Sequence, residues 1–116
     1  MKNKKYNHII FSLILILGSL FTSCGDDFEI SMYGNIYGVV TDYETGEYVE
    51  NVSVLLLPSN MSAMTTIEGT FLYEDVDIQQ YTIVVQKEGY KTNRKIVNPL
   101  RGETINVNIT MEKIRN

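Results

Sequence analysis

The residue types that carry acid–base, nucleophilic or metal chemistry are scarce in this chain. It contains one histidine, His8, and one cysteine, Cys24, in 116 residues. His8 lies in a basic and apolar N-terminal stretch with the features of a removable leader, so the remainder has no imidazole. Ser–His and Cys–His nucleophilic sites and histidine-ligated zinc sites are therefore excluded. We predict no catalytic, cofactor-binding or metal-binding residue.

Carboxylates are the remaining reactive groups, with fourteen Asp and Glu residues in the chain. A glycosidase-like pair or a calcium site would need some of them to converge. Most fall in predicted turns or at outward positions, where solvation accounts for them. Asp75 and Asp77 share one such turn but lack the dense oxygen spacing of a recognisable calcium loop, so a weak calcium site there stays open. We expect the protein not to be an enzyme.

The charge distribution argues against nucleic acid as a partner. Three of the ten basic residues lie within the first five positions, and from Cys24 onward seven basic residues face fourteen acidic ones. Nucleic-acid-binding domains concentrate Lys and Arg. The acidity is explained by solubility.

Residues 1–23 have the three parts of a secretory signal peptide. A basic start (1–8) is followed by a thirteen-residue apolar run (9–21) and by two small residues before Cys24. The apolar run is shorter than the roughly twenty residues that span a bilayer. The sequence therefore predicts a cleaved signal helix and an exported protein.

The end of this leader resembles the lipobox of bacterial lipoproteins, in which the cysteine after the cut is acylated. The resemblance implies that Cys24 carries lipid and anchors the protein to a membrane; the alternative is an ordinary cysteine. Residues 24–33 then form a tether. Its acidic start resembles the export signal of surface-displayed Bacteroidetes lipoproteins, which implies an outer-membrane location with the domain at the cell surface. A periplasm-facing domain is the alternative.

The rest of the chain, residues 34–116, alternates apolar and polar side chains with a period of two. Such alternation in residues rich in Val, Ile, Thr and Tyr predicts half-buried strands. We expect strands near residues 35–42, 52–57, 63–67, 71–76, 81–86, 91–97 and 105–111. Turn residues every eight to twelve positions favour an all-β fold, a single antiparallel seven-stranded β-sandwich.

Three details of the strands are specific enough to test. Gly38, inside the first strand, indicates close approach by a neighbouring group. Residues 91–97 carry Lys and Arg and predict a protected edge strand. Residues 71–76 and 81–86 are expected to pair with each other as a β-hairpin.

The order of motifs resembles the carboxypeptidase-like regulatory domain. The motifs are I-x-G-x-V-x-D (36–42), T-G (45–46), V-x-V-x-L (52–56), T-x-x-x-G-x-F-x-Y (65–73), Y-x-I-x-V (81–85) and G-Y (89–90). The resemblance implies a transthyretin-like, prealbumin-type sandwich. Domains of that family occur on peptidases and outer-membrane receptors, which implies an accessory role.

Exposed tyrosines are the remaining candidates for binding. Tyr43 and Tyr48 flank the predicted T-G turn, and a tyrosine ring with its polar tip suits sugar or protein contacts. For Tyr37 and Tyr90 the alternative is packing within the sandwich or at its corners, and Tyr90, in the G-Y motif, is expected to pack in this way. The leading hypothesis is a membrane-anchored, non-enzymatic interaction module whose partner is an outer-membrane receptor or a peptidase. The alternative is a surface carbohydrate-binding module that holds a glycan through Tyr43 and Tyr48.

Overall fold

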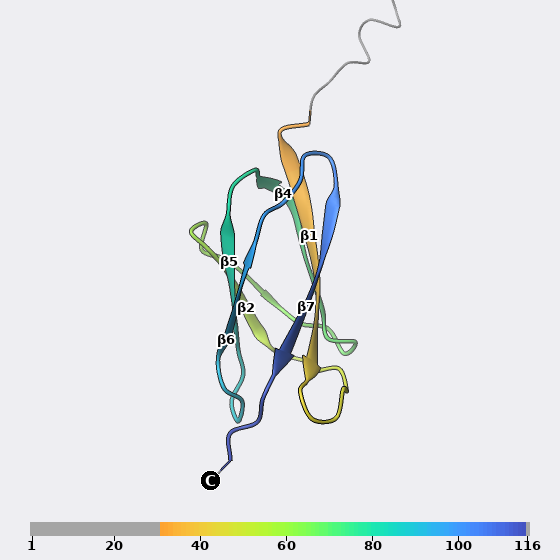
Figure 1. The fold of residues 1–116 in the computed structure, drawn as a ribbon, viewed down its shortest axis with the longest axis vertical. Coiled ribbons are helices and arrows are strands. Elements are labelled where there is room, and N and C mark those ends of the chain that lie inside the picture. The colour runs from red at the N-terminus through yellow and green to blue at the C-terminus, as the bar shows by residue number, and fades with distance from the viewer. Residues whose placement is uncertain (1–30, 116) are drawn as a thin grey trace, which may run out of the picture. The chain divides into compact units, whose positions relative to one another are not determined.

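The computed structural model describes residues 31–115, so the predicted signal peptide and Cys24 lie outside the described residues. Within residues 31–115 no helix is long and apolar enough to cross a membrane. Seven strands make up this part of the chain (Figure 1). They are β1 (Tyr33–Asp42), β2 (Ser53–Leu57), β3 (Met61–Met64), β4 (Thr70–Asp77), β5 (Tyr81–Gln86), β6 (Asn93–Val97) and β7 (Thr104–Met111).

The strands form two sheets, one ordered β4-β1-β7 and the other β3-β2-β5-β6. The predicted all-β sandwich is therefore confirmed. One strand pair departs from the antiparallel expectation, because β1 and β7 run parallel from Asn35↔Thr104 to Asp42↔Met111. Parallel neighbours require a long connection. Here the other five strands provide it.

Alternation places one face of each sheet in a shared core. In β1 the even-numbered residues point inward, with Ile36 and Val40 fully buried. The inward sets predicted for the other strands are buried too, including Val54, Leu56, Tyr73, Val76, Ile83, Val85, Val107, Ile109 and Met111. The core is aliphatic and aromatic throughout, as expected when burial of apolar surface drives folding.

Gly38 leaves room for an aromatic ring from the neighbouring strand of the same sheet. A Cβ added at Gly38 would lie 2.0 Å from Cζ of Phe71, so the Phe71 ring occupies the space that any other side chain would need. Gly38 and Phe71 are register partners across β1 and β4. The close approach predicted at this glycine is confirmed, and the neighbouring group is an aromatic ring.

A bulge in β4 accounts for an irregular spacing in its buried residues. Phe71, Tyr73 and Val76 are all buried, although the last two are three positions apart. The β1–β4 register shifts between Gly34 and Ile36, and Asp75 has a positive φ of 53° there. An extra residue in one strand restores the inward direction of the next side chain.

The hairpin predicted for residues 71–76 and 81–86 is wrong. β4 pairs with β1 and β5 pairs with β2 and β6, so the two strands belong to different sheets. The short link between them crosses from one sheet to the other, and the Tyr81 hydroxyl donates to the Asp77 carbonyl oxygen across it at 2.9 Å. A tyrosine that bonds back to the backbone a few residues upstream is a known sandwich corner.

Several strand boundaries also differ from expectation, and those of β1, β3 and β6 differ by two residues or more, with β1 beginning at Tyr33 and β3 ending at Met64. β3 begins at Met61, two residues before the predicted start at Ala63, because it pairs with β2 from Leu56↔Met61 onward. β6 begins at Asn93 and lies at a sheet edge, which confirms the predicted basic edge strand.

Candidate interaction site

Asp42, the last residue of β1, gathers several loops at the end of the sandwich where β7 also ends. Its Oδ1 accepts hydrogen bonds from the backbone N–H groups of Glu44 (2.9 Å) and Thr45 (3.1 Å). Its Oδ2 accepts one from the Tyr90 hydroxyl at 3.0 Å and lies 3.7 Å from Nζ of Lys113. One buried carboxylate thus holds the β1–β2 loop, the β5–β6 turn and the segment after β7 together.

The electrostatics of this cluster follow from those contacts. The Thr45 N–H lowers the pKa of Asp42 most, and the Tyr90 hydroxyl and the Lys113 charge lower the pKa further against the opposing effect of desolvation. The pKa of Tyr90 is raised by desolvation, then by its hydrogen bond to Asp42 and by the charges of Asp42 and Glu47. Both groups keep the protonation states that favour their contact, so the cluster is a stabilising element.

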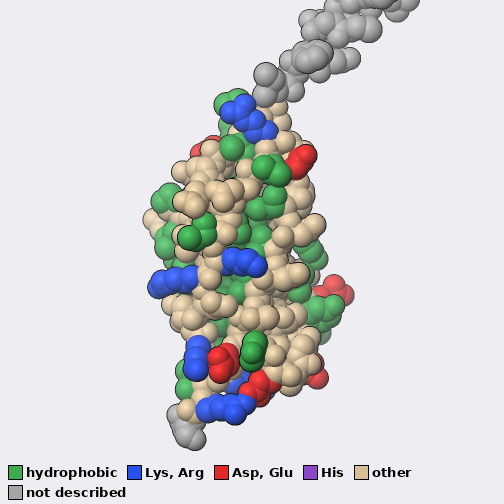
Figure 2. All heavy atoms as spheres, viewed as in Figure 1, with side chains coloured by type: hydrophobic (Ala, Val, Ile, Leu, Met, Phe, Trp, Pro, Cys, Tyr) green, Lys and Arg blue, Asp and Glu red, His purple; other side chains and the backbone are tan. Residues whose placement is uncertain are grey.

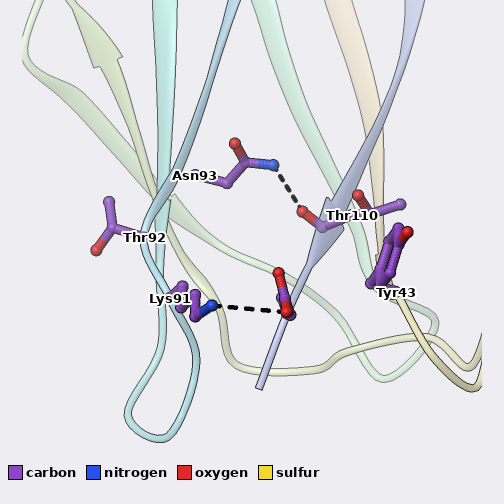
Figure 3. Close-up of a pocket in the computed structure, with 6 residues that line it drawn as sticks. Tyr43, Lys91, Thr92, Asn93 and Thr110 are labelled. Atoms are coloured by element: carbon purple, nitrogen blue, oxygen red, sulfur yellow. Dashed lines mark hydrogen bonds and ion pairs between the residues drawn. The ribbon is translucent and has the colours of Figure 1, made fainter. Parts of the chain in front are cut away.

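A polar hollow of about 400 Å³ lies beside this cluster (Figure 3). It is lined by Tyr43, Lys91, Thr92, Asn93, Thr110 and Glu112. Lys91 pairs with Glu112 at 3.5 Å, and Asn93 donates to the Thr110 carbonyl oxygen at 2.7 Å. In Figure 2 acidic and basic side chains gather at the lower end of the domain, where the C-terminus lies in Figure 1.

A second, more apolar hollow lies on the outside of the three-stranded sheet. It is lined by Tyr37, Val39, Tyr48, Glu68 and Thr70. Leu72 is the register partner of Tyr37 and is 48% exposed, and Tyr48 is 63% exposed. We call the group formed by Tyr37, Val39, Tyr48, Thr70 and Leu72 the outer face. Its exposed large side chains are Tyr37, Tyr48 and Leu72, and aromatic residues are enriched at protein–protein interfaces.

The structure separates the two tyrosines that the sequence analysis grouped as one site. Tyr43 borders the polar hollow and Tyr48 the outer face, although both lie in the β1–β2 connection. Tyr48 forms an isolated bridge with Thr41, which places its side chain over the outward side of β1. A ligand would therefore meet one tyrosine or the other.

The remaining candidates lie elsewhere. Tyr37 is on the outer face, 37% exposed. Tyr90 packs against the core at the corner, as expected. Asp75 and Asp77 lie at the far end of β4, and the described residues contain no group of three or more His, Cys, Asp or Glu side chains placed to hold a metal. Cys24 lies outside the described residues.

The sequence motifs themselves are structural. Gly38 and Asp42, described above, are two motif residues with structural roles, and Thr65 is a third. The buried Thr65 hydroxyl donates a hydrogen bond to the Val49 carbonyl oxygen (2.8 Å) and accepts one from the Val52 N–H (2.9 Å), which fixes the approach to β2. Neither this role of Thr65 nor the Asp42–Tyr90 contact was predicted from the sequence. The sequence did contain a signal for the Asp42–Tyr90 contact, because the I-x-G-x-V-x-D motif ends at Asp42 and the G-Y motif ends at Tyr90.

The family model of the carboxypeptidase regulatory-like domain matches residues 35–112. The chain therefore belongs to the carboxypeptidase regulatory-like family. This confirms the resemblance inferred from the motif order. Among curated proteins, none matches the chain significantly.

Solved structures share the fold at low sequence identity. The minor pilin GBS52 of Streptococcus agalactiae is 16% identical with a TM-score of 0.61, over 75% of this chain and 47% of the pilin. A membrane-associated protein of unknown function from Bacteroides fragilis is 22% identical with a TM-score of 0.59, over 76% and 30% of the two chains.

A cohesin–X-dockerin complex from Acetivibrio cellulolyticus is 22% identical with a TM-score of 0.56, over 69% and 58% of the two chains. This chain spans less than two thirds of the length of each of these proteins. At such identities the likeness establishes an immunoglobulin-like sandwich and nothing more.

Proposed function

We propose that this protein is a lipid-anchored, non-enzymatic interaction module of a bacterial envelope complex, with Cys24 as the anchor and the outer face as the binding surface. The main observation in favour of this binding surface is that Tyr37 and Leu72 are register partners, with Tyr48 beside Tyr37. Tyr37 and Leu72 expose apolar area from two paired strands, and a bridge to Thr41 holds Tyr48 beside them, so binding would not require a loop to become ordered.

Three considerations support the role. The family is a regulatory-like domain, and its fold is shared with a minor pilin and with a cohesin–X-dockerin complex. The sequence of the leader favours lipidation and an outer-membrane location with the domain at the cell surface. The partner expected from the family resemblance is an outer-membrane receptor or a peptidase.

The test is crosslinking in intact cells followed by affinity capture of the tagged full chain. We expect one defined envelope protein to be captured, to be lost with Leu72→Glu and to be retained with Ile96→Glu. Ile96 is a matched control because it is 61% exposed on the other sheet. Equal capture with both variants would reject the outer face as the binding surface.

The anchor is tested separately. Cys24→Ala should abolish incorporation of labelled palmitate and release the protein from the membrane fraction, while leaving its thermal unfolding unchanged. Labelling that persists in Cys24→Ala would contradict lipidation at this residue.

A second candidate function, glycan binding, is favoured by one observation. The Tyr43 ring is 68% exposed and borders the polar hollow that also contains Lys91 and Asn93. An aromatic face beside polar side chains suits a sugar ring. In affinity gels that contain surface polysaccharide, Tyr43→Ala should remove any retardation and Tyr48→Ala should not, because the two tyrosines lie at different hollows. Retardation that neither substitution changes would eliminate this site.

A further inference from the structure

The sandwich has four sheet edges among its described strands, and their protection differs. In the two sheets the outermost strands are β4 and β7, and β3 and β6. An unprotected edge offers unpaired N–H and C=O groups to another strand, and proteins usually block edges with charges, bulges or covering side chains.

Three of the four edges carry such protection. β6 contains Arg94 and Lys95. Side chains of β6 cover β7, because Lys95 Nζ donates to the Asn108 carbonyl oxygen (2.9 Å) and Asn93 to that of Thr110 (2.7 Å). β4 carries a bulge together with acidic residues at its end.

β3 is the exception. It pairs only with β2, and its sequence MSAM contains no charged residue or proline. The uncharged stretch around it extends from Asn51 to Ile67. Met61 is 42% exposed and Met64 58% exposed. We propose that the β3 edge pairs with the β3 edge of a second copy of this chain, which joins two four-stranded sheets into one.

The direction of the backbone groups defines the register of this pairing. The Thr65 N–H donates to the Val52 carbonyl oxygen, so residues an even number of positions away, Met61 and Ala63, also direct their amides toward β2. The amides of Ser62 and Met64 then point away from the sheet, since amide direction alternates along a strand. A two-fold axis through Ser62 pairs its N–H and C=O with those of its own copy.

The same register makes the side chains complementary. Antiparallel pairing centred on Ser62 places each Met61 opposite Ala63 of the second copy, a large side chain against a small one. Met61 and Ala63 lie on the inward face of β3, opposite Leu56 and Val54 of β2. The pairing therefore extends the core across the two-fold axis.

Charge favours pairing between two β3 edges over pairing between the other edges of two copies. A neutral edge meets its own copy without repulsion, whereas two β6 edges would bring Arg94 and Lys95 against each other. Like charges opposite one another destabilise strand pairing. Since β3 has only four residues, the pairing is weak and is best measured at high concentration or in intact cells.

The first test places a thiol on the proposed axis. Hydrogen-bonded antiparallel partners lie about 5.5 Å apart between Cα atoms, which is within disulfide reach. In intact cells that express the full chain, mild oxidation should give a covalent dimer with Ser62→Cys and none above the parent chain with Arg94→Cys. The parent, whose one cysteine is Cys24, sets the background. Equal dimer from both variants, or a Ser62→Cys crosslink only to another protein, would overturn the proposal.

The second test asks whether the edge itself carries the association. In sedimentation equilibrium of the purified full chain in detergent, Ser62→Lys should raise the dimer dissociation constant at least tenfold, while Ile96→Lys on the β6 edge should leave it unchanged. Ser62 is exposed, so the lysine should not disturb folding, which unfolding curves of both variants would verify. A parent chain that sediments as a monomer at several hundred micromolar would also overturn the proposal.

Discussion

The hydroxyl of Tyr90 donates a 3.0 Å hydrogen bond to Oδ2 of Asp42, and the two residues are 48 positions apart in the chain. The contact joins the end of β1 in one sheet to the turn that follows β5 in the other. It is a link between sheets at the end of the sandwich, and it also determines how this end responds to pH.

The pKa of Asp42 should rise when the Tyr90 hydroxyl is removed. Tyr90→Phe deletes a donor that lowers this pKa and leaves the contribution of the Thr45 N–H in place. A carboxyl-detected NMR titration of Asp42 should therefore show a pKa between that of the parent and the ordinary value of 3.8. Tyr43→Phe is the control, since Tyr43 makes no hydrogen bond to Asp42 among the described contacts. An unchanged titration in Tyr90→Phe would argue against the contact.

Asp42 should make the domain sensitive to acid. Its folded-state pKa lies below the unfolded value of 3.8, so its contribution to stability is complete above about pH 4 and is lost as pH falls through the folded-state pKa. Asp42→Asn should lower the melting temperature at pH 7 by several degrees and should flatten its dependence on pH below 4. A parallel loss of melting temperature in the parent and the variant below pH 4 would assign the acid response to other carboxylates.

Tyr73 should have the opposite effect at high pH. Burial raises the pKa of its hydroxyl to about 12, and that hydroxyl donates to the Val54 carbonyl oxygen at 2.8 Å. The unfolded chain ionises near pH 10, so stability from this group is complete below pH 10 and is lost as pH rises toward 12. Urea unfolding of Tyr73→Phe should show a smaller decrease over this interval than the parent shows. Tyr37→Phe, at an exposed position, should follow the parent.

Gly38→Ala should destabilise the domain by overpacking. The added methyl would lie 2.0 Å from the Phe71 ring, and such substitutions typically cost about 1–3 kcal/mol. Replacing Phe71 by Leu in the same chain should recover part of the loss in a urea-unfolding double-mutant cycle. Gly46→Ala is the matched control. Gly46 has a φ of 74° and open space around it, so its cost is backbone strain that Phe71→Leu cannot relieve.

Tyr81→Phe should weaken the corner between the sheets. It removes the hydrogen bond to the Asp77 carbonyl oxygen, whose net contribution is expected to be about 0.5–1.5 kcal/mol. The loss should appear as a lower urea midpoint with an unchanged slope. An unchanged midpoint would mean that water replaces the hydroxyl without loss.

Much of this fold could be predicted from the sequence because alternation is a local property. The buried residues of β1 and β7 follow a period of two, and each strand could be located from its own residues. The partner of a strand is not local. Residues 71–76 and 81–86 have the composition of a hairpin, yet a three-residue link without glycine and the Tyr81 hydroxyl direct β5 into the other sheet.

The candidate sites were less predictable for the same reason. Exposed tyrosines could be found in the sequence, but whether Tyr43 and Tyr48 share a surface depends on the path of the β1–β2 connection. Alternation with Phe71 and Tyr73 predicts that Leu72 points outward, but its position opposite Tyr37 depends on the pairing of β4 with β1. The unprotected character of β3 emerges only when all four edges are compared.

The parallel pairing of β1 and β7 has a mechanical consequence. The described chain enters at one end of the sandwich and leaves at the other, because its first and last strands run in the same direction (Figure 1). Tension applied between Tyr33 and Met111 would load the whole β1–β7 ladder in shear, so its hydrogen bonds would have to break together. A domain connected in this way resists stretching more strongly than one whose terminal strands can be peeled apart bond by bond.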